Sequence, residues 1–297
     1  MVPKTAENFV APFKRDKSKF RRCCALLLIR RGKALRKSGW FFVAIMTLGV
    51  FLPSLAHSEF YVGGYLGPSF VGSVDPHWEF FKSTDLDKFD KPEPSGKYVW
   101  ATRDARGVSV DPSLLLGGKI GYWFTRKSVF GLQMPSWLKY FGFELDISYQ
   151  SLHWPAQDVK VEPVNYIKHM WVNASALTAA FLFLARYGFF PDAEVPFGRL
   201  QPYIGMGPSI FVSNTYANLG KDFRSTEADL GFAVEAGLRY MIYPRISLFG
   251  AFRYRYQPNH VGADDSILDF APASWSYVEM QSTYQFYDLI FGVAYHF

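Results

Sequence analysis

The stretch that decides the fold is 283–297, TYQFYDLIFGVAYHF. Every second residue in it is large and apolar, and the residues between are mixed and partly polar; the apolar set is Tyr287, Leu289, Phe291, Val293, Tyr295 and Phe297. Period two predicts a β-strand with two different environments. It is longer than the roughly 5–6 residues usual for globular strands and suits the about 9–11 that cross a membrane at a tilt. On this strand alone, the final strand of a soluble β-sandwich remains the alternative.

The composition favours a β-protein and argues against a nucleic-acid partner. Aromatic residues make up 19% of the 297-residue chain, which fits aromatic girdles at membrane interfaces. The net charge of +6 comes from the first 58 residues, because the rest holds 20 basic and 24 acidic residues. Both cysteines, Cys23 and Cys24, also lie before residue 59, so the remainder has no disulfide or thiolate chemistry.

Residues 1–58 are expected to be a basic leader that ends in a cleavable signal peptide. The uncharged run WFFVAIMTLGVFLPSL spans 40–55, basic residues precede it, and small residues at 56 and 58 precede a cut before Glu59. The run is short for a helix that crosses about 30 Å of hydrocarbon. An uncleaved inner-membrane anchor is the alternative.

Seven further stretches alternate in the same way, which gives eight expected strands with the closing one. They are 59–70, 113–124, 139–152, 168–186, 200–213, 229–243 and 245–257. Residues 71–111 and 153–167 are expected to be long outer loops, and Pro244-Arg245 a tight turn on the opposite side. Gly67-Pro68-Ser69 and Gly207-Pro208-Ser209 predict bulges or kinks at the rim, because proline cannot donate to a ladder. An even number of strands allows closure without an unpaired edge in lipid.

The sequence resembles the small eight-stranded bacterial outer-membrane β-barrels of the OmpA/OmpX and opacity-antigen type. The residues that carry the likeness are YVGGYLGPSF (61–70), GGKIGYWF (117–124), FGFELDISY (141–149) and VAYHF (293–297). The resemblance implies an all-β, eight-stranded, antiparallel up-and-down transmembrane β-barrel over 59–297, integral to the outer membrane with both termini periplasmic. It also implies that Phe297, with Tyr295 and Val293, is the signal read by the barrel assembly machinery.

Strand parity places a set of charged side chains in the barrel lumen. The set is Lys119, Glu144, Asp146, Glu235, Arg239, Arg253, Arg255 and Asp288. An eight-stranded barrel has room inside only for side chains, and buried charges need partners. We expect an internal ion-pair network that fills the lumen, with a narrow gated conduit as the alternative.

Chemistry beyond this network has little support in the sequence. His153, His169 and His260 lie near the expected outer rim, with Ser151, Asp158, Asp264 and Asp265 nearby in sequence. Outer-membrane lipid A acylases and deacylases combine histidine, serine and an acid, but the spacing here matches none of them. No catalytic, metal or cofactor site is therefore assigned.

The function expected from the sequence is that of a non-enzymatic outer-membrane barrel with a structural or surface-binding role. Its expected partners are outer-membrane lipid and lipopolysaccharide, the assembly machinery and an unidentified extracellular ligand, and nucleic acid is not among them. An enzyme that modifies lipid A, or a narrow channel, is the alternative.

Overall fold

The structure is a computed structural model that describes residues 59–82, 98–124, 135–218, 222–264 and 277–297, so the expected leader lies outside it. Within these ranges the chain forms ten strands and a short 3-10 helix, Ser136–Tyr140. The strands are β1 Glu59–Val71, β2 His77–Lys82, β3 Tyr98–Asp104, β4 Ser113–Trp123, β5 Phe141–Val161, β6 Tyr166–Arg186, β7 Leu200–Asn218, β8 Asp222–Tyr243, β9 Ile246–Asp264 and β10 Tyr277–His296. No helix among the described residues is long and apolar enough to cross a membrane.

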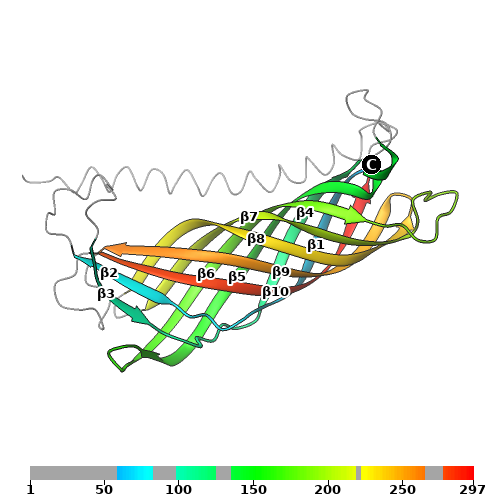
Figure 1. The fold of residues 1–297 in the computed structure, drawn as a ribbon. Coiled ribbons are helices and arrows are strands. Elements are labelled where there is room, and N and C mark those ends of the chain that lie inside the picture. Colours follow the sequence, from blue (N-terminus) through cyan, green and yellow to red (C-terminus); the bar gives the residue numbers. More distant parts are fainter. Residues whose placement is uncertain (1–58, 83–97, 125–134, 219–221, 265–276) are drawn as a thin grey trace, which may run out of the picture. The chain divides into compact units, whose positions relative to one another are not determined.

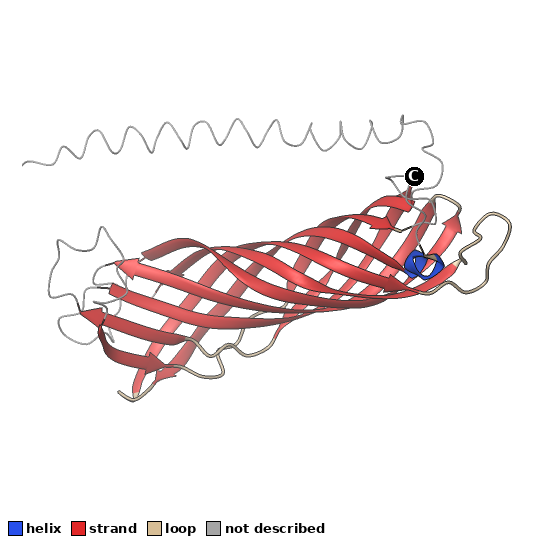
Figure 2. Ribbon diagram, turned by 45° about the horizontal axis from the view of Figure 1, so that its top comes forward, coloured by secondary structure: helices blue, strands red, loops and turns tan. Residues whose placement is uncertain are grey.

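Eight of these strands close into an antiparallel ring, as the sequence predicts. β1 pairs with β4, the strands from β4 to β10 pair in chain order, and β10 returns to β1. Figures 1 and 2 show the strands tilted around a common axis. We call the end where β1 begins and β10 finishes the near end, and the opposite end the far end.

The far end holds more structure than the sequence predicts. β10 is longer than β1. Past the far end of β1, residues 277–281 of β10 pair with β2, which pairs in turn with β3. The expected long loop over 71–111 therefore contains two strands, β2 and β3, and β2 pairs with the far-end part of β10. The expected loop over 153–167 is also wrong, because β5 continues to Val161 and β6 starts at Tyr166. β7, β8 and β9 likewise extend past their predicted far ends.

Along the near half of the barrel, apolar side chains point outward and polar side chains inward. On β5, Leu145 and Ile147 are 42% and 44% exposed, whereas Glu144 and Asp146 between them are fully buried. The same outward set on β10 includes Leu289 and is exposed to a similar degree. This is the arrangement of a barrel whose outer surface lies in lipid.

Toward the far end the two faces exchange character. On β5, Leu152 and Trp154 are the inward, buried residues, whereas Ser151 and His153 are exposed on the outside. Leu152 and Trp154 belong to a buried apolar cluster that draws on the far-end parts of the strands and on the segment around Val108. Polar residues outside and apolar residues inside are typical of a β-structure in water.

The two Gly-Pro-Ser motifs do not form the predicted bulges. The β1–β10 ladder is interrupted at Gly67 and Pro68 and resumes in the same register, and the β6–β7 ladder is interrupted in the same way at Gly207 and Pro208. A Cβ atom on Gly67 would lie 1.7 Å from the Leu289 carbonyl oxygen. The motif therefore brings neighbouring strands close where proline has no N–H to donate. On β7 the motif lies within the wall, so the expectation of a rim position is wrong there, whereas on β1 it lies two residues from the end of the strand.

Candidate functional site

The lumen of the near half is the most charged buried region among the described residues. It is supplied by inward side chains of β4, β5, β8, β9 and β10, and all eight residues selected by parity are at most 1% exposed there. We call them the lumenal cluster: Lys119, Glu144, Asp146, Glu235, Arg239, Arg253, Arg255 and Asp288. Alternation alone turns these side chains inward, because successive residues of a strand face opposite sides of the wall.

Glu235 on β8 is the central acceptor of the lumenal cluster. Its Oε1 accepts hydrogen bonds from Lys119 Nζ at 2.9 Å and from the Tyr203 hydroxyl at 2.6 Å. Its Oε2 accepts from Arg253 Nε at 2.8 Å. Charge-assisted bonds of this kind offset the cost of removing a carboxylate from water.

Arg253 connects Glu235 to β5. Its two terminal nitrogens donate to Asp146 Oδ1 and Oδ2 at 2.9 and 2.7 Å, which is a bidentate pair. Tyr65 on β1 also donates to Asp146, at 2.7 Å. Lys119 lies 2.9 Å from a carboxylate oxygen of Glu144. Six strands, β1, β4, β5, β7, β8 and β9, thus contribute to one continuous network.

A second pair lies beside this network, toward the far end. Arg255 Nε donates to Asp288 Oδ2 at 2.7 Å, and its other nitrogens donate to Gln150 at 2.6 Å and Thr178 at 3.1 Å. Asp288 is directly opposite Arg253 in the β9–β10 register but bonds to Arg255. Register alone therefore did not give the partner.

Arg239 has a different environment from the other bases of the lumenal cluster. Its guanidinium carbon lies 4.2 Å from the centroid of the Tyr61 ring and 5.5 Å from that of Tyr203. Tyr61 donates its own hydroxyl hydrogen to Glu144. Cation–π contacts with buried rings stabilise a guanidinium at such distances.

Sequence reasoning missed the aromatic and arginine residues that complete this region. Tyr61, Tyr65 and Tyr203 supply hydroxyl donors, and Arg186 places its guanidinium carbon 4.2 Å from the centroid of the Trp123 ring. The signal was present, since the tyrosines share the inward parity of their strands. The tyrosines were overlooked because only charged residues were considered. Arg186 was overlooked because it is the last residue of its predicted strand.

The three rim histidines are not brought together. His169 lies 2.8 Å from Asp158, His260 lies 2.7 Å from Asp229, and His153 lies 3.8 Å from Asp111, each on a different part of the far end. Ser151 is exposed on the outer face of β5. The Asp264 side chain and Asp265 are outside the described residues. Across the described ranges, no group of three or more His, Cys, Asp or Glu residues could hold a metal ion.

At the near end, the connection between β6 and β7 is ordered by Asp192. This carboxylate accepts the backbone N–H groups of Val195 at 2.7 Å and Glu194 at 3.0 Å, and also the guanidinium of Arg199. The Val195 N–H first, and then Arg199, lower the pKa of the Asp192 carboxyl below its usual range. Arg199 in turn donates to the Ile242 carbonyl at 3.1 Å, which ties this connection to the next turn.

The residues of the expected assembly signal face outward at the near end. Val293 is 50% exposed and Phe297 is 38% exposed. The Phe297 ring lies 5.4 Å from the Phe60 ring and 5.1 Å from the Tyr295 ring, and its N–H donates to the Phe60 carbonyl. The end of the chain is thus joined to the start of β1.

Comparison with known proteins identifies a family over most of the chain. The sequence model of the family described as "Outer membrane protein beta-barrel domain" matches residues 42–297. No curated protein matches the sequence.

Several solved structures match most of the length of this chain. The outer membrane protein OprG from Pseudomonas aeruginosa is 15% identical, with a TM-score of 0.48, and the match covers 82% of this chain and 98% of OprG. Neisserial surface protein A is 13% identical with a TM-score of 0.33, covering 82% and 99%. The Ail protein of Yersinia pestis, in complex with a heparin analogue, is 12% identical with a TM-score of 0.31, covering 80% and 99%.

Proposed function

Because the chain belongs to the outer membrane β-barrel domain family, we propose that it is an integral outer-membrane barrel without a conducting pore or catalytic activity. Its role is structural or surface-binding, through the far end. The observation that carries this is the lumenal cluster, whose charged side chains are all buried and, apart from Arg239, held in ion pairs. A lumen occupied in this way leaves no wide aqueous path.

The change of polarity along the strands supports one orientation in the membrane. The far end has polar outward residues and an apolar interior, so it suits water beyond the membrane, whereas the near end has the tight Pro244-Arg245 turn. The longest connection of the barrel, 72–112, which contains β2 and β3, is at the far end, and long extracellular connections are typical of this class of barrel. The far end is therefore extracellular and both termini are periplasmic. The surface of the far end is exposed to lipopolysaccharide, and an extracellular ligand would bind to this surface.

Conductance tests the closed lumen. The purified barrel, reconstituted into planar bilayers, is expected to give no stable current steps. Stable openings on the nanosiemens scale would contradict the proposal. Mass spectrometry of lipid A from cells with and without the protein tests the absence of catalysis, and an acylation pattern that depends on the protein would show an enzyme.

Cysteine labelling in intact cells tests the orientation. In a background with Cys23→Ser and Cys24→Ser, a membrane-impermeant maleimide is expected to label Val164→Cys at the far end and not Glu194→Cys at the near end. Both positions are exposed, so access to the reagent depends on the side of the membrane. After lysis both variants should react. The opposite labelling pattern would reverse the orientation.

A further inference from the structure

Among the described side chains, Arg239 is the one base of the lumenal cluster that is not held in an ion pair with a carboxylate. Lys119, Arg253 and Arg255 are each paired with acids of the cluster. The three nitrogens of the Arg239 guanidinium, Nε, Nη1 and Nη2, are buried and donate no hydrogen bond to a described group. A buried cation is costly unless it is both paired and hydrogen-bonded, so an anion beside this arginine would be favourable.

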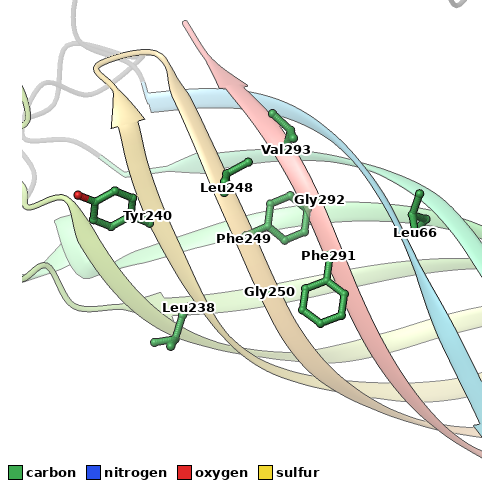
Figure 3. A pocket seen from close by; sticks show the side chains of 9 residues that line it. All are labelled: Leu66, Leu238, Tyr240, Leu248, Phe249, Gly250, Phe291, Gly292 and Val293. Atoms are coloured by element: carbon green, nitrogen blue, oxygen red, sulfur yellow. The ribbon is translucent and has the colours of Figure 1, made fainter.

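The position of Arg239 in the wall explains why no protein acceptor reaches it. Its neighbours along β8, Leu238 and Tyr240, project from the outward surface (Figure 3), so Arg239 between them points into the lumen. On β9 it is paired with Phe249, whose side chain has no hydrogen-bond acceptor. On β7 it is paired with Gln201.

The amide of Gln201 is already engaged, and a second guanidinium engages it. Arg186 on β6 donates to Gln201 Oε1 at 3.0 Å, and Gln201 Nε2 donates to the Gly198 carbonyl at 2.9 Å. The guanidinium carbons of Arg186 and Arg239 lie 4.2 and 5.6 Å from the centroid of one ring, that of Trp123. Two buried cations beside one ring repel each other, and an anion close to both would offset this repulsion.

The Trp123 ring provides a further donor. Its Nε1–H is buried and donates to no described group. An indole N–H and a guanidinium can only donate, so a ligand that contacts both must accept. The Tyr61 and Tyr203 rings lie 4.2 and 5.5 Å from the guanidinium carbon of Arg239, and a lumen of eight strands is filled by side chains. The site therefore suits a small ion.

We propose that the near-end lumen binds one chloride ion, which accepts hydrogen bonds from the Arg239 guanidinium and the Trp123 indole. Arg186 adds a second positive charge nearby. Because Arg186 is the last residue of β6, the site lies at the near end of the lumen, where a small ion from solution enters. The chloride takes the place that carboxylates have beside the other bases of the lumenal cluster. The site does not depend on which side of the membrane the near end faces.

Two buried tryptophans provide a matched pair of variants. Trp123→Phe keeps a ring at the site and removes only the indole donor. Trp154→Phe is the control, because the Trp154 Nε1–H is buried in the same way but belongs to the apolar far-end cluster. Arg239→Gln removes the cation itself. Heat-modifiable gel migration confirms that each variant is folded.

Equilibrium dialysis with radioactive chloride measures the ion bound by the purified protein in detergent micelles, with sodium gluconate holding the ionic strength constant. The wild type and Trp154→Phe are expected to bind one chloride per barrel, Trp123→Phe to bind it several-fold more weakly, and Arg239→Gln to lose it. The wild type should also unfold at a lower temperature in gluconate than in chloride, because a ligand that binds only the folded state stabilises it.

Two results would overturn the site: no chloride bound by the wild type, or equal binding by the wild type, Trp123→Phe and Arg239→Gln. Competition with inorganic phosphate tests the kind of anion. Phosphate should not displace the bound chloride, and displacement at equal concentration would overturn the assignment to a monatomic ion.

Discussion

Glu235 accepts hydrogen bonds from β4, β7 and β9, so one carboxylate holds three parts of the wall together. Removing its charge leaves Lys119 and Arg253 buried with fewer negative partners. Buried ion pairs add little net stability as pairs, but breaking one by removing a partner is costly.

We therefore expect Glu235→Gln to lower the free energy of unfolding by about 3–5 kcal/mol. Urea titration of the barrel in detergent micelles measures the change. The control is Asp158→Asn, which removes an exposed pair with His169 and should leave stability unchanged. If the two substitutions have the same effect, the lumenal cluster does not stabilise the barrel.

At the scale of the element, the connection between β6 and β7 should respond to acid. Because the folded pKa of Asp192 is depressed, its contribution is complete above the unfolded value of about 3.9 and is lost as the pH falls through the folded value. Protection of the amides in 187–199, measured against the intrinsic exchange rate at each pH, should therefore fall below about pH 4. In Asp192→Asn, exchange should be faster at neutral pH and lose this pH dependence.

The control is Glu194→Gln, which keeps the backbone contacts of Asp192 and should behave like the wild type. A wild-type profile that does not change with pH would contradict the expectation.

Alternation along the sequence was sufficient to predict the near half of the strands and was insufficient for the far half. On β5 the apolar residues change faces between Tyr149 and Leu152, and the β5–β6 register shifts between Trp154 and Gln157. An exchange of faces followed by a bulge removes the period of two, so a strand resembles a loop. β2 and β3 were missed because each is short and lies in a polar stretch.

The lumenal cluster, too, could be predicted from the sequence only in part. Parity placed the lumenal side chains on one face, and all of them are buried, since their strands keep a strict alternation. Which acid meets which base depends on how far each side chain reaches across the barrel, as the Arg255–Asp288 pair shows. The tyrosine donors to Glu144, Asp146 and Glu235 depend on the same cross-barrel distances.

At the scale of the whole molecule, the seam between β1 and β10 is where the barrel closes. We expect deletion of Phe297 to reduce assembly in the outer membrane several-fold, because the deletion removes the last contact with Phe60 and the residue that the resemblance assigns to recognition by the assembly machinery. The fraction of heat-modifiable protein in outer-membrane extracts measures assembly. Phe297→Tyr, which keeps the ring, should assemble normally. Full assembly of the deletion variant would remove this role from the terminus.

The partners inside the lumen come from distant parts of the chain. Arg253 bonds to Asp146, 107 positions away, and to Tyr65, 188 positions away. Contacts of such high sequence separation form late in folding, after the loops between them have closed. While the sheet is open, the pairs that cross the lumen, such as Arg253 with Asp146, cannot form, and exposure of an open edge and of unpaired ions to hydrocarbon is strongly unfavourable. Entry into the bilayer and closure of the ring must therefore proceed as one cooperative event, with formation of these cross-lumen pairs as its final step.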